Sequence, residues 1–408
     1  MIGIRRLINP VQEYAWGSTT AIPGLLGLAN PDGRPQAELW MGAHPRGPSL
    51  VDMEGRRISL AELIAYDPEA VLGSETVARF GAGLPFLFKV LAAAKPLSIQ
   101  AHPDKEQARA GFARENREKI PLDAFQRSYR DAFHKPEILC ALTGFWALKG
   151  FRPAAEILDL CAGLGPVGLD SELELLRASG EAGLKAFFGA LMSLPAGRRE
   201  RACAEAAARC KELSLRTAPA ARAEWAWIAR LHDLYPGDSG SLAPLYLNLV
   251  HLAPGEALFL PAGELHAYLE GTGIELMANS DNVLRGGLTP KHVDVPELLR
   301  ILRFEPASAV LQESRPGGSG ETVYRSPARE FRLSRLTLPP GGGAGYEANG
   351  PRSVEILLCT RGEAFIRVRG GAVDGLLIRQ GESVLIAADL PGYTIRGEAD
   401  LYKAAVPL

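Results

Sequence analysis

The sequence contains few cysteines and no long apolar segment, and these absences exclude several classes of protein. Its 408 residues include five cysteines, and none of them forms a C-x-x-C pair. An odd number of cysteines without paired spacing predicts reduced, buried thiols rather than a disulfide framework. No apolar run reaches about 18 residues, so no membrane span is expected. The N-terminal residues M-I-G-I-R-R-L-I-N-P lack the apolar core of a signal peptide. The sequence therefore predicts a cytoplasmic protein.

The sequence also lacks an excess of charge of either sign. Its formal net charge is −2, from 45 basic and 47 acidic residues that are interspersed along the chain. This balance argues against binding to nucleic acid or to an anionic membrane. A phosphorylated small molecule stays compatible with it, because such a ligand needs only a few local cations. We expect a small-molecule partner, and nothing in the sequence demands more than a monomer.

Histidine is absent after position 292, which limits where a histidine-dependent metal site can lie. The seven histidines are His44, His102, His134, His232, His251, His266 and His292. The C-terminal region therefore cannot hold such a site by itself. Any such site must be built from the earlier part of the chain.

The pattern of residues divides the chain into two β regions and one helical region. Residues 153–235 are rich in Ala, Leu, Glu and Arg, with helical runs at 154–161, 171–176, 181–194, 198–213 and 220–234. Short strands and turns precede and follow this segment. We predict a mainly β fold with a helical insertion. It has a discontinuous catalytic β domain (1–152 and 240–304), an all-helical domain (153–239) and a C-terminal β domain (305–408).

Three local predictions accompany this division. Residues 59–80 and the charged segment from about 104 to 118 have helical spacing. In the C-terminal region, 353–360 and 363–368 are predicted to form separate strands among those of a sandwich or jelly roll.

The stretch K-P-L-S-I-Q-A-H-P-D-K, from Lys95 to Lys105, predicts one wall of a polar cavity. In a strand, Gln100 and His102 would share one face, and the apolar Ile99 and Ala101 would share the other. Pro103 would end the strand, because proline cannot donate to a ladder. An imidazole beside a neutral amide suits a divalent metal that is held partly by oxygen.

Glu137 and His266 are the other candidate metal ligands. Glu137 opens an apolar strand in H-K-P-E-I-L-C-A-L, where a carboxylate is either solvated at a sheet edge or bound to a metal. His266 follows the turn residues Pro261 and Gly263. Two imidazoles, one carboxylate and one amide would leave a divalent ion with net positive charge and able to accept oxygen ligands. Closed structural zinc sites prefer thiolates, and no cysteine lies beside these residues in a ligand pair, so the sequence predicts a catalytic site.

Charged residues in apolar or glycine-rich surroundings are further candidates. Lys89 lies in the apolar strand L-P-F-L-F-K-V-L, where its burial is expensive unless it points into a polar site. Glu275, Asp281 and Lys291 lie in a second largely apolar segment, where solvated loop charges are the alternative. Arg285 precedes Gly286 and Gly287, which would let a ligand approach the backbone closely.

Several motifs together resemble one known family. G-x5-P-x-G-x2-H, from Gly255 to His266, resembles the second motif of the cupin superfamily. Combined with S-I-Q-A-H-P-D-K, H-K-P-E and S-D-N-V-L-R-G-G-L-T-P-K-H in this order, it makes the chain closely resemble the type I mannose-6-phosphate isomerases. The resemblance extends from Y-A-W-G near the start to Lys291. The residue before H-K-P-E is usually Asn in that family and is Phe133 here.

The resemblance implies a fold, a cofactor and a reaction. The fold would be a pair of cupin-like jelly rolls with a helical domain inserted in the first. One zinc ion per chain would be bound by Gln100, His102, Glu137 and His266. The reaction would interconvert mannose 6-phosphate and fructose 6-phosphate through an enediolate. The C-terminal β domain would have a structural role.

Within that reaction several roles stay open. The base that moves the proton between C2 and C1 could be Glu275 or Lys135, and Lys135 would first have to lose its own proton. His134 and Asp281 could serve the opening of the sugar ring. Arg285, the active-site arginine of the resemblance, could stabilise the enediolate or hold the phosphate.

Ser98 and Lys89 are further candidates for binding the phosphate. Two other functions compete with the isomerase. One is another metal-dependent cupin enzyme, either an iron-dependent oxygenase, which needs a redox metal, or another sugar-phosphate isomerase. The other is a non-catalytic sugar-binding cupin, which would predict a gap in the charged set.

Overall fold

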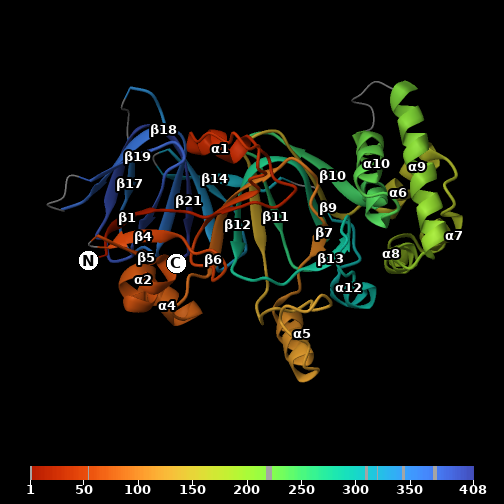
Figure 1. Cartoon of the computed structure of the whole chain (residues 1–408), viewed down its shortest axis with the longest axis horizontal. Helices are drawn as coiled ribbons and strands as arrows, with labels where there is room; N and C mark the ends of the chain where they lie inside the picture. The colour runs from red at the N-terminus through yellow and green to blue at the C-terminus, as the bar shows by residue number, and fades with distance from the viewer. Residues whose placement is uncertain are drawn as a thin grey trace.

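The computed structural model describes residues 2–53, 55–216, 223–307, 311–318, 320–341, 345–370 and 375–408. Figure 1 shows three parts in a row, with a β region in the middle, the C-terminal β region on one side and a group of helices on the other. The predicted mainly β fold with a helical insertion is confirmed. The predicted residue limits of the three domains remain a prediction.

The middle part is built on a branched sheet of ten strands, six of which lie in the order β10-β9-β12-β6-β3-β2. Its strands are β2 (Val11–Gln12), β3 (Glu38–Met41), β6 (Phe86–Ala93), β7 (Ile99–Ala101), β8 (Glu137–Ala141), β9 (Phe145–Phe151), β10 (Leu247–Leu252), β11 (Ala257–Leu260), β12 (His266–Ala278) and β13 (Leu284–Gly287). The strands come from both sides of the helical segment, as the discontinuous pattern of the sequence predicts.

Strand β12 joins the two halves of this sheet. Its first residues, from His266, pair with β9 and β7, and its residues from Gly271 onward pair with β6 and β8. Gly271 has φ +132°, and a Cβ there would lie 2.7 Å from the carbonyl oxygen of Gly144, so the bend requires glycine. One strand therefore carries His266 at one end and Glu275 near the other.

The C-terminal part contains a sheet of nine strands. They are β1 (Ile4–Leu7), β14 (Ser314–Gly318), β15 (Glu321–Tyr324), β16 (Arg332–Leu338), β17 (Tyr346–Ala348), β18 (Glu355–Val368), β19 (Leu376–Arg379), β20 (Ser383–Ile386) and β21 (Tyr393–Ala405). Strand β1 comes from the start of the chain, and Ile4 pairs with Ile386. The first residues thus belong to the C-terminal sheet, which the predicted limits 1–152 of the first domain do not account for.

The helices fall into an inserted group and several short pieces around the sheets. The inserted group is α6 (Ala154–Leu164), α7 (Asp170–Ser179), α8 (Leu184–Met192), α9 (Ala196–Arg216) and α10 (Ala223–Leu234). The other helices are α1 (Ala21–Leu26), α2 (Leu60–Tyr66), α3 (Pro68–Leu72), α4 (Ser74–Phe80), α5 (Lys105–Arg117), α11 (Ala243–Tyr246) and α12 (Val295–Ile301). A hairpin of β4 (Leu50–Met53) and β5 (Arg56–Ser59) completes the fold. No described helix is long and apolar enough to cross a membrane.

Two of the local predictions differ from the structure. The predicted helix at 59–80 is divided into α2, α3 and α4, because Pro68 starts a new helix and Gly73, at φ +90°, ends it. The two strands predicted at 353–360 and 363–368 are one strand, β18, with a register shift between Cys359 and Arg361. The start of the helical run predicted at 220–234 lies outside the described residues, and its remainder is α10.

The three parts share their hydrophobic cores. One apolar cluster contains side chains of both β regions, among them Phe88 and Ile274 from the middle part and Ile356 and Tyr402 from the C-terminal part. A second cluster joins the inserted helices to the middle part, with Phe188 packed against Phe151. The sheet that carries His266 and Glu275 is therefore packed against the inserted helices on one side and the C-terminal β region on the other.

Candidate metal centre

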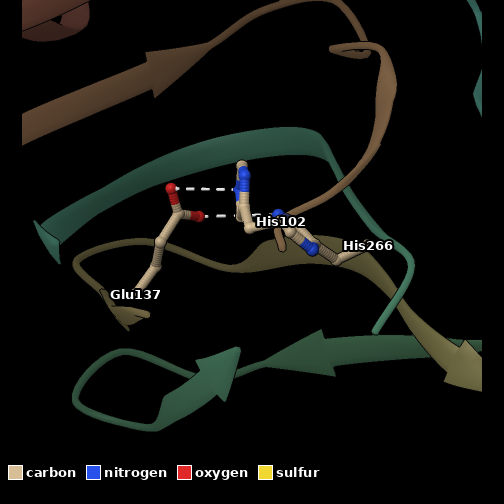
Figure 2. Close-up of side chains that lie close together, drawn as sticks. All are labelled: His102, Glu137 and His266. Atoms are coloured by element: carbon tan, nitrogen blue, oxygen red, sulfur yellow. Dashed lines mark ion pairs between the residues drawn. The ribbon is translucent and has the colours of Figure 1, made fainter. Parts of the chain in front are cut away.

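The side chains of His102, Glu137 and His266 converge inside the middle β region. One ligand atom from each lies within 4.8 Å of those of the other two, and all three residues are buried. Figure 2 shows the Glu137 carboxylate facing both imidazole rings. Three residues that are far apart in the sequence thus form one compact set of metal-ligating groups.

Local sequence explains how each residue reaches this place. His102 follows β7, which ends at Ala101 before Pro103. Glu137 is the first residue of β8 and follows Pro136. His266 opens β12 after a turn at Gly263, whose N–H donates to the carbonyl of His102 at 2.8 Å. The three ligand candidates therefore all lie at strand ends.

His102 is held in the tautomer that a metal ligand needs. Its Nδ1–H donates to the carbonyl oxygen of Asn282 at 2.7 Å. Its Nε2 lies 3.4 Å from Glu137 Oε1 and is buried without a hydrogen-bond partner among the described residues. Burial, followed by the charge of Lys135, lowers the pKa of His102 to about 4. The ring is therefore neutral at pH 7, with a free electron pair directed into the site.

Glu137 and His266 complete the set. The Nε2 atom of His266 lies 3.5 Å from Glu137 Oε2, and its Nδ1 lies 3.1 Å from the carbonyl oxygen of Glu264. Burial alone would raise the pKa of Glu137, but the ammonium of Lys135 and the imidazole of His102 hold it well below its ordinary value. A buried, ionised carboxylate between two imidazoles is a donor set that fits a divalent cation such as zinc.

Strand register places Gln100 and Arg285 next to this set. On β7, Gln100 pairs with His266 on one side and with Arg285 of β13 on the other. Residues that pair directly across antiparallel strands point to the same face of the sheet. The amide nitrogen of Gln100 donates to Ser98 Oγ at 3.4 Å, which leaves the amide oxygen for another partner.

A second polar cluster lies on the other half of β12. Lys89 of β6 pairs in register with Glu275, and its Nζ lies 2.8 Å from Glu275 Oε2 and 3.7 Å from Glu38 Oε2. Burial alone would lower the pKa of Lys89, but these carboxylates raise it. Burial raises the pKa of Glu275, and the charge of Lys89 offsets only part of this shift. A buried carboxyl with a raised pKa suits proton transfer near neutral pH.

Cationic side chains lie near Arg285. Burial, followed by the charge of Arg130, lowers the pKa of Arg285. Burial and then the charges of Arg285, Arg130 and Arg46 lower the pKa of Lys291. Within the described part of the chain, neither Arg285 nor Lys291 has a salt bridge. Mutually repelling cations without carboxylate partners form a place for an anion.

The remaining predicted residues each have a charged partner. Lys135 lies 2.7 Å from Glu137 Oε1, within the metal set. The Nε2 atom of His134 points away from the set, to Glu330 of the C-terminal region at 2.8 Å. Asp281 contacts Arg46 at 2.6 Å and His44 at 3.5 Å. Burial would raise the pKa of Asp281, but these two partners lower it to about 2.

Sequence reasoning missed several residues of the site. Asn282, which orients His102, lies in the S-D-N-V motif but acts through its backbone carbonyl, so its residue type gave no signal. Tyr268 is buried, and burial followed by the charge of Glu275 raises its pKa well above the ordinary value. Its position two residues after His266 could have indicated a shared face of the strand. Arg130 stands in a loop with no distinguishing pattern.

Comparisons with known proteins identify relatives over nearly the whole chain. The chain is 44% identical over 391 residues to mannose-6-phosphate isomerase of Salmonella typhimurium, covering 95% of each protein. It is 41% identical over 408 residues to the Escherichia coli protein of that name, covering 98% of this chain and 99% of that one. Identity to the human mannose-6-phosphate isomerase is 37% over 378 residues, covering 86% of each.

Solved structures and a family model agree with these relatives. A crystal structure of a phosphomannose isomerase variant from Salmonella typhimurium matches with a TM-score of 0.90 and 41% identity over 100% of both chains. A zinc-bound mannose 6-phosphate isomerase matches with a TM-score of 0.89 and 41% identity, also over 100% of both chains. Residues 4–154 match the model of the catalytic domain of type I phosphomannose isomerase. The chain therefore belongs to the type I phosphomannose isomerase family.

Proposed function

We propose that this chain is a zinc-dependent aldose–ketose isomerase that interconverts mannose 6-phosphate and fructose 6-phosphate. One observation supports this most directly: the buried Nε2 atom of His102, without a hydrogen-bond partner among the described residues, faces the Glu137 carboxylate. An unsatisfied buried nitrogen is costly unless a ligand completes it. The isomerase relatives and the zinc-bound neighbour supply the chemistry that this site would perform.

The metal would be held by His102, Glu137, His266 and the amide oxygen of Gln100. When bound there, zinc would supply positive charge close to the two oxygens of an enediolate. The Nδ1 hydrogen bonds of the two histidines fix the orientation of their rings. Lys135, beside Glu137, helps to keep that carboxylate ionised.

Arg285 and Lys291 are assigned to the phosphate of the substrate, with Arg130 nearby. The charge of Arg130 lowers the pKa of Arg285, and the charges of both arginines lower the pKa of Lys291; a dianionic phosphate would relieve that repulsion. Ser98, whose hydroxyl accepts a hydrogen bond from the Gln100 amide, is also assigned to substrate binding. Lys89 has a different role, because its ammonium is engaged by Glu275 and Glu38.

The proton between C2 and C1 is carried by Glu275 in this proposal, and Lys135 is the alternative base. The raised pKa of Glu275 favours a carboxyl that both accepts and returns a proton near neutral pH. Lys135 is paired with Glu137 at 2.7 Å, so its ammonium is already engaged by a proposed metal ligand. Asp281, ionised and paired with His44 and Arg46, is assigned to ring opening, whereas His134, bound to Glu330, supports the segment that carries Glu137.

Removal and return of the metal test this function. Treatment of the purified protein with a chelator should abolish conversion of mannose 6-phosphate to fructose 6-phosphate, and zinc should restore it. Full activity in metal-free protein would contradict the proposed role of the metal. Metal analysis of untreated protein should give one zinc per chain. Iron together with oxygen-dependent turnover would favour a cupin oxygenase, and zinc without turnover would favour a non-catalytic sugar-binding cupin.

The setting of the enzyme is also part of the proposal. All the residues assigned above come from one chain, which is compatible with a monomer. The five cysteines are buried and unpaired, which supports a reducing compartment such as the cytoplasm.

A further inference from the structure

A second polar cavity lies in the C-terminal β region, away from the metal centre. Its volume is about 460 Å³, and residues of β14, β15, β16, β17 and β21 contribute to its walls. A cavity of this size falls within the range of small-molecule sites. The region has no histidine, so any ligand there would be bound without the metal chemistry of the first site.

The wall of the cavity contains a buried lysine between two carboxylates. The Nζ atom of Lys403 lies 2.9 Å from Glu321 Oε1 and 3.6 Å from Glu355 Oε1, and it also donates to the hydroxyl of Tyr346. Lys403 is only 2% exposed. Buried charges of this kind are expensive, and apolar side chains of similar volume commonly serve stability as well or better. The cluster therefore needs a reason other than packing.

Strand register aligns this cluster with arginines at the edge of the sheet. Arg315 pairs with Val323, Val323 pairs with Ser334, and Ser334 pairs with Lys403, across four neighbouring strands. Directly paired residues share one face, so Arg315 and Lys403 are on the same side of the sheet. Arg332, two residues before Ser334 on β16, shares that face as well.

The charges that line the cavity do not cancel. Its carboxylates have cationic partners: Glu321 is paired with Lys403, Glu355 with Arg352 at 3.3 Å, and Glu347 with Arg369 at 3.2 Å.

By contrast, neither Arg315 nor Arg332 has a salt bridge to any described residue. Arg332 lies close enough to Glu321 to lower the pKa of that carboxyl, but Glu321 is already paired with Lys403. The cavity wall therefore has more positive than negative side chains, which suits a phosphate monoester.

We propose that the C-terminal β region contains a second, non-catalytic site for a small phosphate ester that carries hydroxyl groups, with Arg315 and Arg332 as its anion-binding pair. The arginines bind the phosphate, and the polar cluster around Lys403 offers donors and acceptors to the hydroxyls. The same combination of a buried lysine and two carboxylates occurs beside the metal centre, where Lys89 lies between Glu275 and Glu38.

Counting bound ligand tests the proposal. The probe is a hexitol 6-phosphate, a reduced sugar phosphate that has no carbonyl group and cannot be isomerised. Calorimetric titration of the zinc-bound protein should give one more equivalent per chain than titration of the double variant Arg315→Ala, Arg332→Ala. The control variant is Arg325→Ala, because Arg325 is exposed and pairs with Glu313 at 2.7 Å outside the cavity. It should bind as many equivalents as the unmodified protein.

Equal stoichiometry and affinity in the double variant and the unmodified protein would overturn the proposal. The isomerase activity of the double variant should stay within about twofold of the unmodified value, since neither arginine lies near the metal ligands. If the double variant does not fold, the single variant Arg315→Ala, at an exposed position, replaces it. This variant should bind the additional equivalent of hexitol 6-phosphate with reduced affinity. An unchanged affinity in that single variant would likewise count against the site.

Discussion

The two β regions bury the same kind of charged cluster and differ in what surrounds it. In the middle region Lys89 lies between Glu275 and Glu38, with the ring of Trp40 5.7 Å away. In the C-terminal region Lys403 lies between two carboxylates, with the ring of Tyr346 4.6 Å away. Only the first cluster has imidazoles and a further carboxylate beside it.

This difference shows that the buried lysine is not what makes a site catalytic. In the first region the cluster holds Glu275 next to a set of metal-ligating groups, so the proposed proton acceptor and Lewis acid would act on one substrate. In the second region the same arrangement has arginines but no imidazole around it, so it can bind an anion but has no metal-ligating set to activate a carbonyl group. Function depends on the residues placed around a shared framework rather than on the framework.

The largest effect should follow from removing a ligand of the first region. His266→Ala should lose bound zinc and reduce kcat/KM by at least about 1,000-fold, because only three of the four proposed ligand groups would remain around the ion. Metal analysis and a coupled isomerase assay measure the two losses. His251→Ala, at an exposed position on β10, serves as the control and should retain both. Stoichiometric zinc in His266→Ala would show that the ligand set is wrong.

Replacing Arg285, the cation proposed for the active site, should have the next largest effect. Arg285→Ala should keep its zinc but lower kcat by about 100-fold or more, because an enediolate or phosphate would lose a charged donor. Parallel metal analysis separates this outcome from that of His266→Ala. A kcat close to that of the unmodified chain would move Arg285 out of the active site.

Replacing each buried lysine tests the comparison itself. Lys89→Met should reduce the free energy of unfolding by about 3–5 kcal/mol, since it leaves two buried carboxylates without their cation. Lys403→Met should reduce it by less, because Glu355 keeps Arg352 and only Glu321 loses its salt-bridge partner. Only Lys89→Met should also lower kcat in the protein that stays folded, because only Glu275 lies beside the metal set. Urea denaturation and the isomerase assay give the two quantities. If Lys403→Met lowered kcat as strongly as Lys89→Met, the second cluster would not be separate from catalysis.

The smallest effect concerns acid sensitivity in the second cluster. Burial would raise the pKa of Glu321, but Lys403 lowers it below its ordinary value of 4.5. A carboxyl with a lowered folded-state pKa stabilises the protein above its ordinary pKa, and this stabilisation is lost as the pH falls through the lowered value. Glu321→Gln should therefore lose less stability than the unmodified protein when the pH falls below 4.5. Thermal unfolding at several pH values measures this slope, which should be steeper in the exposed control Glu313→Gln.

The parts of the fold and of the site that depend on a local residue pattern could be predicted from the sequence. Alternation in S-I-Q-A-H separates the polar face of β7 from its apolar face, and β8 begins at Glu137 as its proline predicts. The amphipathic composition of the inserted segment predicted its helices. The resemblance to a family connected these local signals across the chain.

Contacts between residues that are far apart in the sequence had no such local pattern. The sequence makes Lys89 one candidate for binding phosphate, but its partner Glu275 is 186 residues away in the sequence, and only the register of β6 against β12 brings them together. Likewise, Ile4 carries nothing that indicates a partner as distant as Ile386. Asn282 orients His102 through a backbone carbonyl, which every residue type possesses.

The pairing of β1 with β20 has a consequence for how the chain is made. Strand β1 is synthesised long before β20 and must wait for it before its backbone groups are paired, and such distant pairings form slowly. Until then the edge of β20 has no neighbour on that side, and an unpaired edge is prone to association with other chains. A fusion or truncation at the N-terminus would therefore disturb the pairing of β20, near the opposite end of the sequence, and would do so during folding more than in the folded enzyme.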